Sequence, residues 1–239
     1  MFVDARKAHL NPKCGEDVYI ELPQEAGEGP GKCGKLVHWL YGFRRAAQAW
    51  EDHYSEKFES VGFVRGKASP VVFEHKERDV VVVVHGDDFT FEGGGVDLEW
   101  ILEEMKKWFE VKLRGVLGPE EQDDKEVTIL GRVVKWCEWG VEYSADPRLR
   151  GKLLEQFGLD ESSKVLTTNG SKEEEAGDDE QLEAEEAKPY RRGAATLNYL
   201  GQDCPDISFG TKEACRGMAV PTRGDYRRLK RVVRFVLGR

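Results

Sequence analysis

The sequence predicts an α+β fold that begins with strands and helices and becomes mainly helical after about residue 145. Residues 80–91 carry the first half of this prediction, because five consecutive valines lead into Gly86-Asp87-Asp88 and an aromatic-rich return, which is typical of a buried β-hairpin. The second half rests on apolar residues that recur at helical spacing in four segments after residue 145.

Further strands and two helices are predicted in the first part of the chain. Residues 2–5, FVDA, read as a short apolar strand followed by a polar bend. A helix is expected over about 46–60 because its apolar residues fall on one side. A second helix follows three glycines at 93–95, with Asp97 as its N-cap. The remaining predicted strands cover 18–22, 71–75, 127–136 and 140–144.

The later helices show clear start and stop signals. Asp146 is a natural N-cap, Pro147 suits the first turn, and Gly158 marks a stop. Thr222 with Asp225 three residues later forms a capping box that has Asp in place of Glu. Beyond the first of these helices, the sequence predicts helices over 190–201, 206–217 and 222–237.

Charge is segregated along the chain, although the net charge is −9. Residues 171–187 hold nine acids and one lysine, a local charge of −8. Residues 188–239 hold twelve Lys/Arg and four acids, a local charge of +8. We expect two domains, 1–145 and 146–239, and we expect the acidic insertion at 171–187 to be disordered because it lacks an apolar stripe.

Composition excludes several classes of protein. Five cysteines, without a CxxC pair, indicate neither a zinc site nor a disulfide framework. No apolar run approaches the roughly 18 residues that span a bilayer, and the first residues do not resemble a signal peptide. We therefore expect an intracellular protein with no membrane partner.

Asp87 and Asp88 are the strongest candidates for chemistry. Two adjacent carboxylates on a turn after a buried strand suit hard cations such as Mg²⁺, although Gly-Asp-Asp is also an ordinary hairpin turn. Two-metal phosphoryl transfer needs carboxylates from separate strands. Asp4, on the short strand near the start of the chain, is the candidate for the third carboxylate.

Four segments in order resemble the motifs of copia-type LTR retrotransposon reverse transcriptases. Residues 4–10, DARKAHL, resemble DVxxAFL, and residues 18–23, VYIELP, resemble VYMxQP. Residues 40–50, LYGFRRAAQAW, resemble LYGLKQAPRAW, and residues 85–88, HGDD, stand where the family has YVDD. Weaker matches continue over 109–112, 129–131, 189–191, 198–200, 205–207 and 229–232.

The resemblance implies an RNA-directed DNA polymerase fragment of a Pol polyprotein, with a right-hand palm followed by a helical thumb or connection region. It implies two-metal nucleotidyl transfer in which Asp4, Asp87 and Asp88 hold two Mg²⁺ ions, with Mn²⁺ as a substitute. The implied partners are a primer–template, dNTPs, an upstream fingers segment and a downstream RNase H domain. The implied location is a cytoplasmic virus-like particle or the nucleus.

The same resemblance assigns residues that bind the nucleotide, the template or the nucleic-acid backbone. Tyr41, Gly42 and Arg44 stand where the family lines the nascent base pair and the template strand, although Tyr41 could equally be a packed core residue. His9 stands where the family has an aromatic residue under the incoming sugar, and Gly86 allows a primer backbone to approach closely. The basic C-terminal segment suits phosphate contacts, although it also fits a solvated face. The residues expected to contact the backbone are Arg227, Arg228, Lys230, Arg231 and Arg234.

Departures from the family pattern keep other functions open. His9 replaces an aromatic residue that selects the sugar, His85 replaces the tyrosine of YVDD, and Ala47 replaces a proline. One alternative is a catalytically inactive remnant that at most binds nucleic acid. Another is a metal hydrolase with His85, Asp87 and Asp88 as ligands. Without a fingers segment, we expect the isolated chain to incorporate little or no nucleotide.

Overall fold

A computed structural model describes residues 1–160, 162–167 and 178–238, and the chain divides into two compact units. The first unit is Met1–Asp124 and the second is Lys125–Arg239. The division falls earlier than the predicted boundary at 145, because the strands that follow residue 125 belong to the second unit. The first unit mixes strands and helices and the second is mainly helical, which confirms the α+β prediction.

The first unit is built on a six-stranded antiparallel sheet with the order β4-β5-β6-β7-β1-β8. The predicted hairpin is confirmed, with its turn at Gly86 and Asp87 between β6 and β7. Strand β1, the predicted strand at 2–5, lies between β7 and β8 although it is distant from both in sequence. The strands are β1 (Phe2–Ala5), β4 (Val64–Arg65), β5 (Val72–His75), β6 (Val80–His85), β7 (Asp88–Glu92) and β8 (Val111–Gly115).

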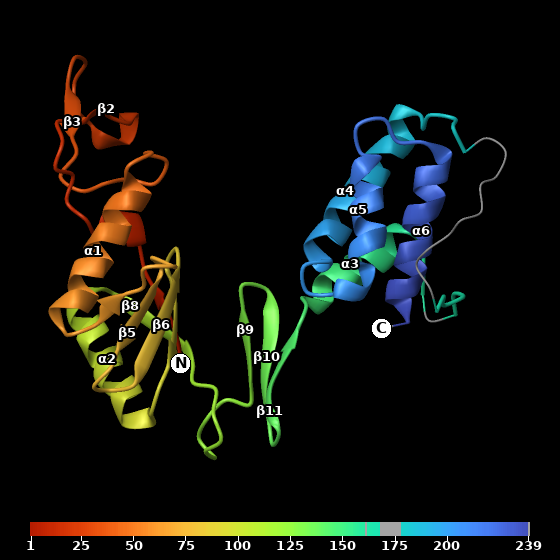
Figure 1. Ribbon diagram of the computed structural model, residues 1–239. Helices are drawn as coiled ribbons and strands as arrows, with labels where there is room; N and C mark the ends of the chain where they lie inside the picture. The colour runs from red at the N-terminus through yellow and green to blue at the C-terminus, as the bar shows by residue number, and fades with distance from the viewer. Residues whose placement is uncertain (161, 168–177, 239) are drawn as a thin grey trace. The chain divides into compact units, whose positions relative to one another are not determined.

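Helices α1 (Ala46–Ser60) and α2 (Gly95–Trp108) pack on one face of this sheet (Figure 1). Alternate residues of β6 point into the core between sheet and helices, so Val82 is fully buried while Val83 is 44% exposed. The prediction for α1 is confirmed. Asp97 is not the N-cap of α2: Gly94 holds that position, and Asp97 lies in the first turn.

A short excursion precedes α1. It contains the hairpin β2 (Tyr19–Glu21) and β3 (Cys33–Lys35), paired in antiparallel register. Two 3₁₀ turns, Ala8–Leu10 and Gln24–Ala26, flank β2. The first of them places His9 directly after the strand that carries Asp4.

The second unit opens with a three-stranded antiparallel sheet of β9 (Glu126–Ile129), β10 (Arg132–Cys137) and β11 (Gly140–Ser144). A single strand over 127–136 was the wrong prediction. Leu130 and Gly131 have φ values of 48° and 80°, and this left-handed pair folds the segment back as a two-residue hairpin turn.

Four helices complete the second unit: α3 (Pro147–Gln156), α4 (Ala184–Leu200), α5 (Ser208–Arg216) and α6 (Arg223–Leu237), with a 3₁₀ turn at Pro205–Ile207 (Figure 1). Their apolar faces share one core. The Asp146 side chain caps α3 by accepting from the N–H of Arg148, and Thr222 and Asp225 form the predicted capping box of α6. No described helix is long and apolar enough to cross a membrane.

The acidic segment 171–187 is ordered over its second half. Residues 171–177 lie outside the described residues. Disorder was the wrong prediction for 178–187, because Gln181 bridges to Thr222, Leu182 packs against the helical core and Ala187 is buried in α4. Backbone pairing and two apolar contacts thus offset the local excess of acids.

Candidate active site

The antiparallel register brings two of the three candidate carboxylates face to face. Asp4 on β1 pairs directly with Asp88 on β7, and cross-strand partners project from the same face of a sheet. Asp87 lies in the turn next to them, and its carbonyl accepts the N–H of Ala5 at 2.8 Å. Since their neighbours Val3 and Phe89 point into the core, Asp4 and Asp88 lie on the face opposite α1 and α2.

Arg114 on β8 holds Asp4. Its Nη2 donates to Asp4 Oδ2 at 2.8 Å, and the Asp4 side chain is only 17% exposed while that of Arg114 is 48% exposed. The guanidinium therefore occupies one oxygen of a candidate metal-binding carboxylate. Asp4 also raises the pKa of Arg114, chiefly through this hydrogen bond.

The electrostatics of Asp88 reveal a concentration of negative charge. Burial raises the pKa of this carboxyl, and the neighbouring carboxylates of Asp87 and Asp4 raise it further. Arg114 and His85 oppose the shift without cancelling it. A site that accumulates like charge in this way is stabilised by a bound cation.

The donor set fits a hard divalent cation in chemistry, because Mg²⁺ prefers carboxylate oxygens. The three aspartate side chains do not surround a common position for a cation. Within residues 1–160, 162–167 and 178–238, no group of three or more His, Cys, Asp or Glu side chains is placed to hold a metal ion. Asp4 would have to turn from Arg114 to complete the set with Asp87 and Asp88.

Half-buried His9 and exposed Tyr41 form a stacked aromatic pair. Their rings stack with centroids 4.5 Å apart, and Tyr41 is 55% exposed, so it is not a core residue. Gly42, in the left-handed region at φ 93°, and Arg44 are exposed beside it. The structure thus brings His9 and Tyr41 together, while their contact with a nucleotide stays a prediction.

Gly86 lies at the tip of the β6–β7 hairpin with φ 65°, a conformation that L side chains rarely adopt. A Cβ added there would meet no atom within 4 Å, so the tip is open to an approaching backbone. The indole Nε1 of Trp50 donates to the Gly86 carbonyl at 2.8 Å. This bond ties the turn to α1.

Comparison with known proteins supports the motif matches. No protein-family model and no solved structure matches the chain. Over 99% of its length it aligns with two proteins of Arabidopsis thaliana, the retrovirus-related Pol polyproteins from transposons RE1 and RE2, with 25% and 24% identity. The chain is similar to retrotransposon Pol polyproteins. The predicted resemblance is thereby confirmed.

The chain spans 16% of the length of each of these Pol polyproteins. It therefore corresponds to one segment of a much larger protein. The activity and partners of the whole polyprotein are not carried over to the segment by this similarity alone.

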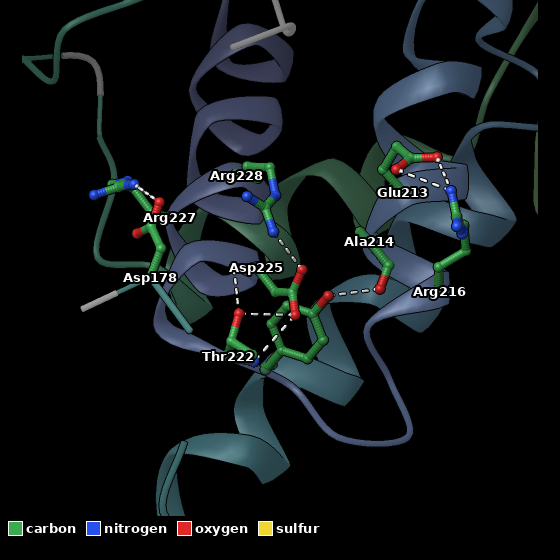
Figure 2. Close-up of polar contacts among 9 residues, drawn as sticks. Asp178, Glu213, Ala214, Arg216, Thr222, Asp225, Arg227 and Arg228 are labelled. Atoms are coloured by element: carbon green, nitrogen blue, oxygen red, sulfur yellow. Dashed lines mark hydrogen bonds and ion pairs between the residues drawn. The ribbon is translucent and has the colours of Figure 1, made fainter. Parts of the chain in front are cut away.

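Helix α6 does not present an open basic face in this Pol-related chain. Arg227 pairs with Asp178, and Arg228 donates to Asp225 at 2.7 Å (Figure 2). Lys230, Arg231 and Arg234 are half-buried rather than exposed. The predicted role of these residues in backbone binding stays a prediction, and the structure shows that acids of the same chain compete for at least two of the arginines.

Two residues of the site were not found from sequence. Arg114 reaches Asp4 only because β1 and β8 are neighbours, although 110 positions separate the two residues. Trp50 reads as a core residue from its helical spacing, and nothing in that spacing signals the bond to Gly86. Both contacts follow from sheet order and helix placement, which local patterns do not contain.

Proposed function

We propose that residues 1–124 form the palm of an RNA-directed DNA polymerase and that Asp4, Asp87 and Asp88 hold its two divalent cations. The pairing of Asp4 with Asp88 beside the Gly86-Asp87 turn carries this proposal. It supplies carboxylates from two different strands on one face, as two-metal phosphoryl transfer requires. The similarity to Pol polyproteins supports the same assignment.

The residues of the chain have distinct roles in this proposal. When bound, the cations would activate an attacking hydroxyl and neutralise charge on the leaving oxygens. Trp50 fixes the turn that carries Asp87, and Gly86 leaves room for a primer backbone. The stacked His9 and Tyr41 rings offer a flat surface to a nucleotide.

Arg114 is a positioning residue in this proposal. Its bond to Asp4 lowers the repulsion among the carboxylates before a cation binds. The positive charge of Arg114 also competes with the cation for Asp4. Cation binding is therefore coupled to release of Asp4 from Arg114. We expect Mn²⁺ to bind more tightly to Arg114→Gln than to the native chain, with Arg6→Gln, which removes the exposed pair with Glu110, as the matched control.

Primer extension tests the proposal. The chain, extended upstream with a fingers segment, is supplied with an RNA template, a DNA primer, dNTPs and Mg²⁺. Asp87→Asn should reduce extension by about 10³-fold or more, because it removes a charged ligand of the cations that neutralise developing charge on the phosphate oxygens. Asp52→Asn, on the exposed side of α1, should leave extension unchanged. Extension that survives Asp87→Asn would refute the metal site.

A catalytically inactive remnant is the second candidate, and the Asp4–Arg114 bond favours it. A folded, template-binding chain that neither extends a primer nor binds Mn²⁺ would establish this alternative. Electron paramagnetic resonance of added Mn²⁺ measures the second property independently of turnover.

A further inference from the structure

The described part of the acidic segment lies along the start of α6. The backbone N–H groups of Arg223 and Gly224 donate to the carbonyls of Glu180 and Asp178, at 2.9 and 3.1 Å. Leu182 donates to the carbonyl of Pro221 at 2.9 Å. The bonds of Arg223 and Gly224 satisfy N–H groups that a helix leaves without intrahelical partners in its first turn. We name residues 178–182 the acidic strap.

Side chains of the strap neutralise arginines of α6. Glu180 pairs with Arg223 at 2.9 Å, and the Asp178 carboxylate points at the Arg227 guanidinium (Figure 2). Both arginines belong to a helix that carries six Lys/Arg and one acid over residues 223–237. The strap therefore covers part of the most basic helix of the described chain.

The two ion pairs of the strap differ in exposure. The Arg223 and Glu180 side chains are 55% and 66% exposed, whereas Arg227 is 37% exposed and Asp178 only 13% exposed. Exposed pairs contribute little and are screened by salt. A phosphate backbone offers several charged oxygens at once, and each guanidinium can bind phosphate in the same forked geometry as a carboxylate.

We propose that the acidic strap is an autoinhibitory contact, which a nucleic-acid backbone must displace to reach Arg223 and Arg227. The proposal rests on the proposed polymerase function only in naming nucleic acid as the partner. The strap carboxylates hold the two guanidinium groups where phosphates would otherwise pair with them. Binding therefore exchanges two internal ion pairs for two external ones, and the intrinsic affinity of α6 is masked.

Gly224 allows the strap to close. It is buried, and a Cβ added at this position would lie 2.9 Å from Cγ and 3.0 Å from Cβ of Asp178. Such distances are too short for carbon atoms, so an alanine would push the strap away without changing any charge. The helix itself favours alanine over glycine, and the Thr222–Asp225 capping box stays in place.

The test compares Gly224→Ala with Gly151→Ala in the full chain. Gly151 is a matched control because it lies in α3 with no atom within 4 Å of an added Cβ. Binding of a fluorescent RNA–DNA duplex is measured by anisotropy, without dNTP or divalent cation, over a salt series. We expect Gly224→Ala to bind about fivefold more tightly, and the slope of log affinity against log salt to steepen by about 1 to 2. Gly151→Ala should match the native chain.

A charge variant tests the strap independently of the steric one. Asp178→Asn with Glu180→Gln should reproduce the tighter binding and the steeper slope. Glu185→Gln with Glu186→Gln makes the same change of charge on exposed residues of α4 and should have a clearly smaller effect. Equal effects of the two double variants, or no effect of Gly224→Ala on a chain that circular dichroism shows to be folded, would overturn the proposal.

Other outcomes separate this proposal from the polymerase assignment. If Gly224→Ala tightens binding to phosphatidylserine vesicles but not to the duplex, the partner is a membrane surface and the proposal is wrong. A chain that binds duplex as predicted but fails to extend a primer contradicts the catalytic assignment alone. If the chain extends a primer and the strap variants leave its duplex affinity unchanged, only the proposal of an autoinhibitory strap is wrong.

Discussion

Asp88 in the first unit and Asp225 in the second have opposite electrostatic surroundings. Burial raises the pKa of Asp88, and two neighbouring carboxylates add to the shift. Burial would also raise the pKa of Asp225, but hydrogen bonds from Arg228 and Thr222 outweigh it and hold the pKa below the ordinary value. One carboxylate is destabilised by its fold and the other is stabilised by it.

This difference separates a candidate site from structural polar contacts. In the second unit, the strap and the N-terminal turn of α6 pair Asp178, Glu180 and Asp225 with arginines. In the first unit, the carboxylates of Asp4, Asp87 and Asp88 repel each other. Asp4 and Asp88 lie on the sheet face opposite the packed core. Unfavourable electrostatics that a fold maintains are typical of functional sites. Three predictions test this comparison, beginning with the largest effect.

The comparison assumes that both units have rigid cores. Truncation of a core side chain in either unit should therefore have the largest effect on the unfolding free energy. Phe58 is fully buried among aromatic rings of the first unit, and Leu229 is fully buried in the second. We expect Phe58→Ala to cost about 3–5 kcal/mol and Leu229→Ala about 2–5 kcal/mol of unfolding free energy. Urea unfolding measures both values. A cost below about 1 kcal/mol in either unit would show a loosely packed core.

Loss of the capping box should have an intermediate effect. Asp225→Asn should cost about 1 kcal/mol at pH 7, because the charged acceptor of the Thr222 and Arg228 hydrogen bonds is lost. Since the folded-state pKa of Asp225 is lowered, its contribution is fully present above the ordinary value of 3.8 and disappears as the pH falls through the folded-state pKa.

Urea unfolding at pH 7 and pH 3 checks this sign. The difference between Asp225→Asn and the native chain should shrink at the lower pH. A constant difference would mean that the charge of Asp225 does not stabilise the fold.

Removal of the repelling carboxylate should have the smallest effect and the opposite sign. A raised pKa means that the folded state binds protons more strongly, so the native chain loses stability as the pH rises above 3.8. Asp88→Asn should therefore gain stability at pH 7, by less than about 1 kcal/mol after screening by solvent. The gain should vanish near pH 3.

Thermal unfolding of Asp88→Asn and the control Asp52→Asn measures this gain. Added Mg²⁺ should raise the melting temperature of the native chain more than that of Asp88→Asn. Destabilisation by Asp88→Asn at pH 7 would contradict the comparison, because it would make Asp88 another paired structural charge.

Local patterns predicted most of the helices and strands. The spacing of Trp50, Tyr54 and Phe58 predicted α1 within its observed bounds, and the valine run predicted β6 and its turn. These predictions succeed because the periodicity of burial is written into consecutive residues. They fail where contacts outside the local pattern set the bounds of an element. Examples are the Leu130-Gly131 turn and α4, which begins at Ala184, before the predicted start at 190.

The sequence by itself determined which residues are candidates for chemistry: the carboxylates of Asp4, Asp87 and Asp88, the glycine of the turn and the segregated charges. Only the tertiary structure decided how they meet. Strand order places Asp4 opposite Asp88 and delivers Arg114 to it, and chain reversal lays the acidic strap on α6. The physical reason is that pairing between distant strands depends on the burial of whole faces, which no local stretch of sequence encodes.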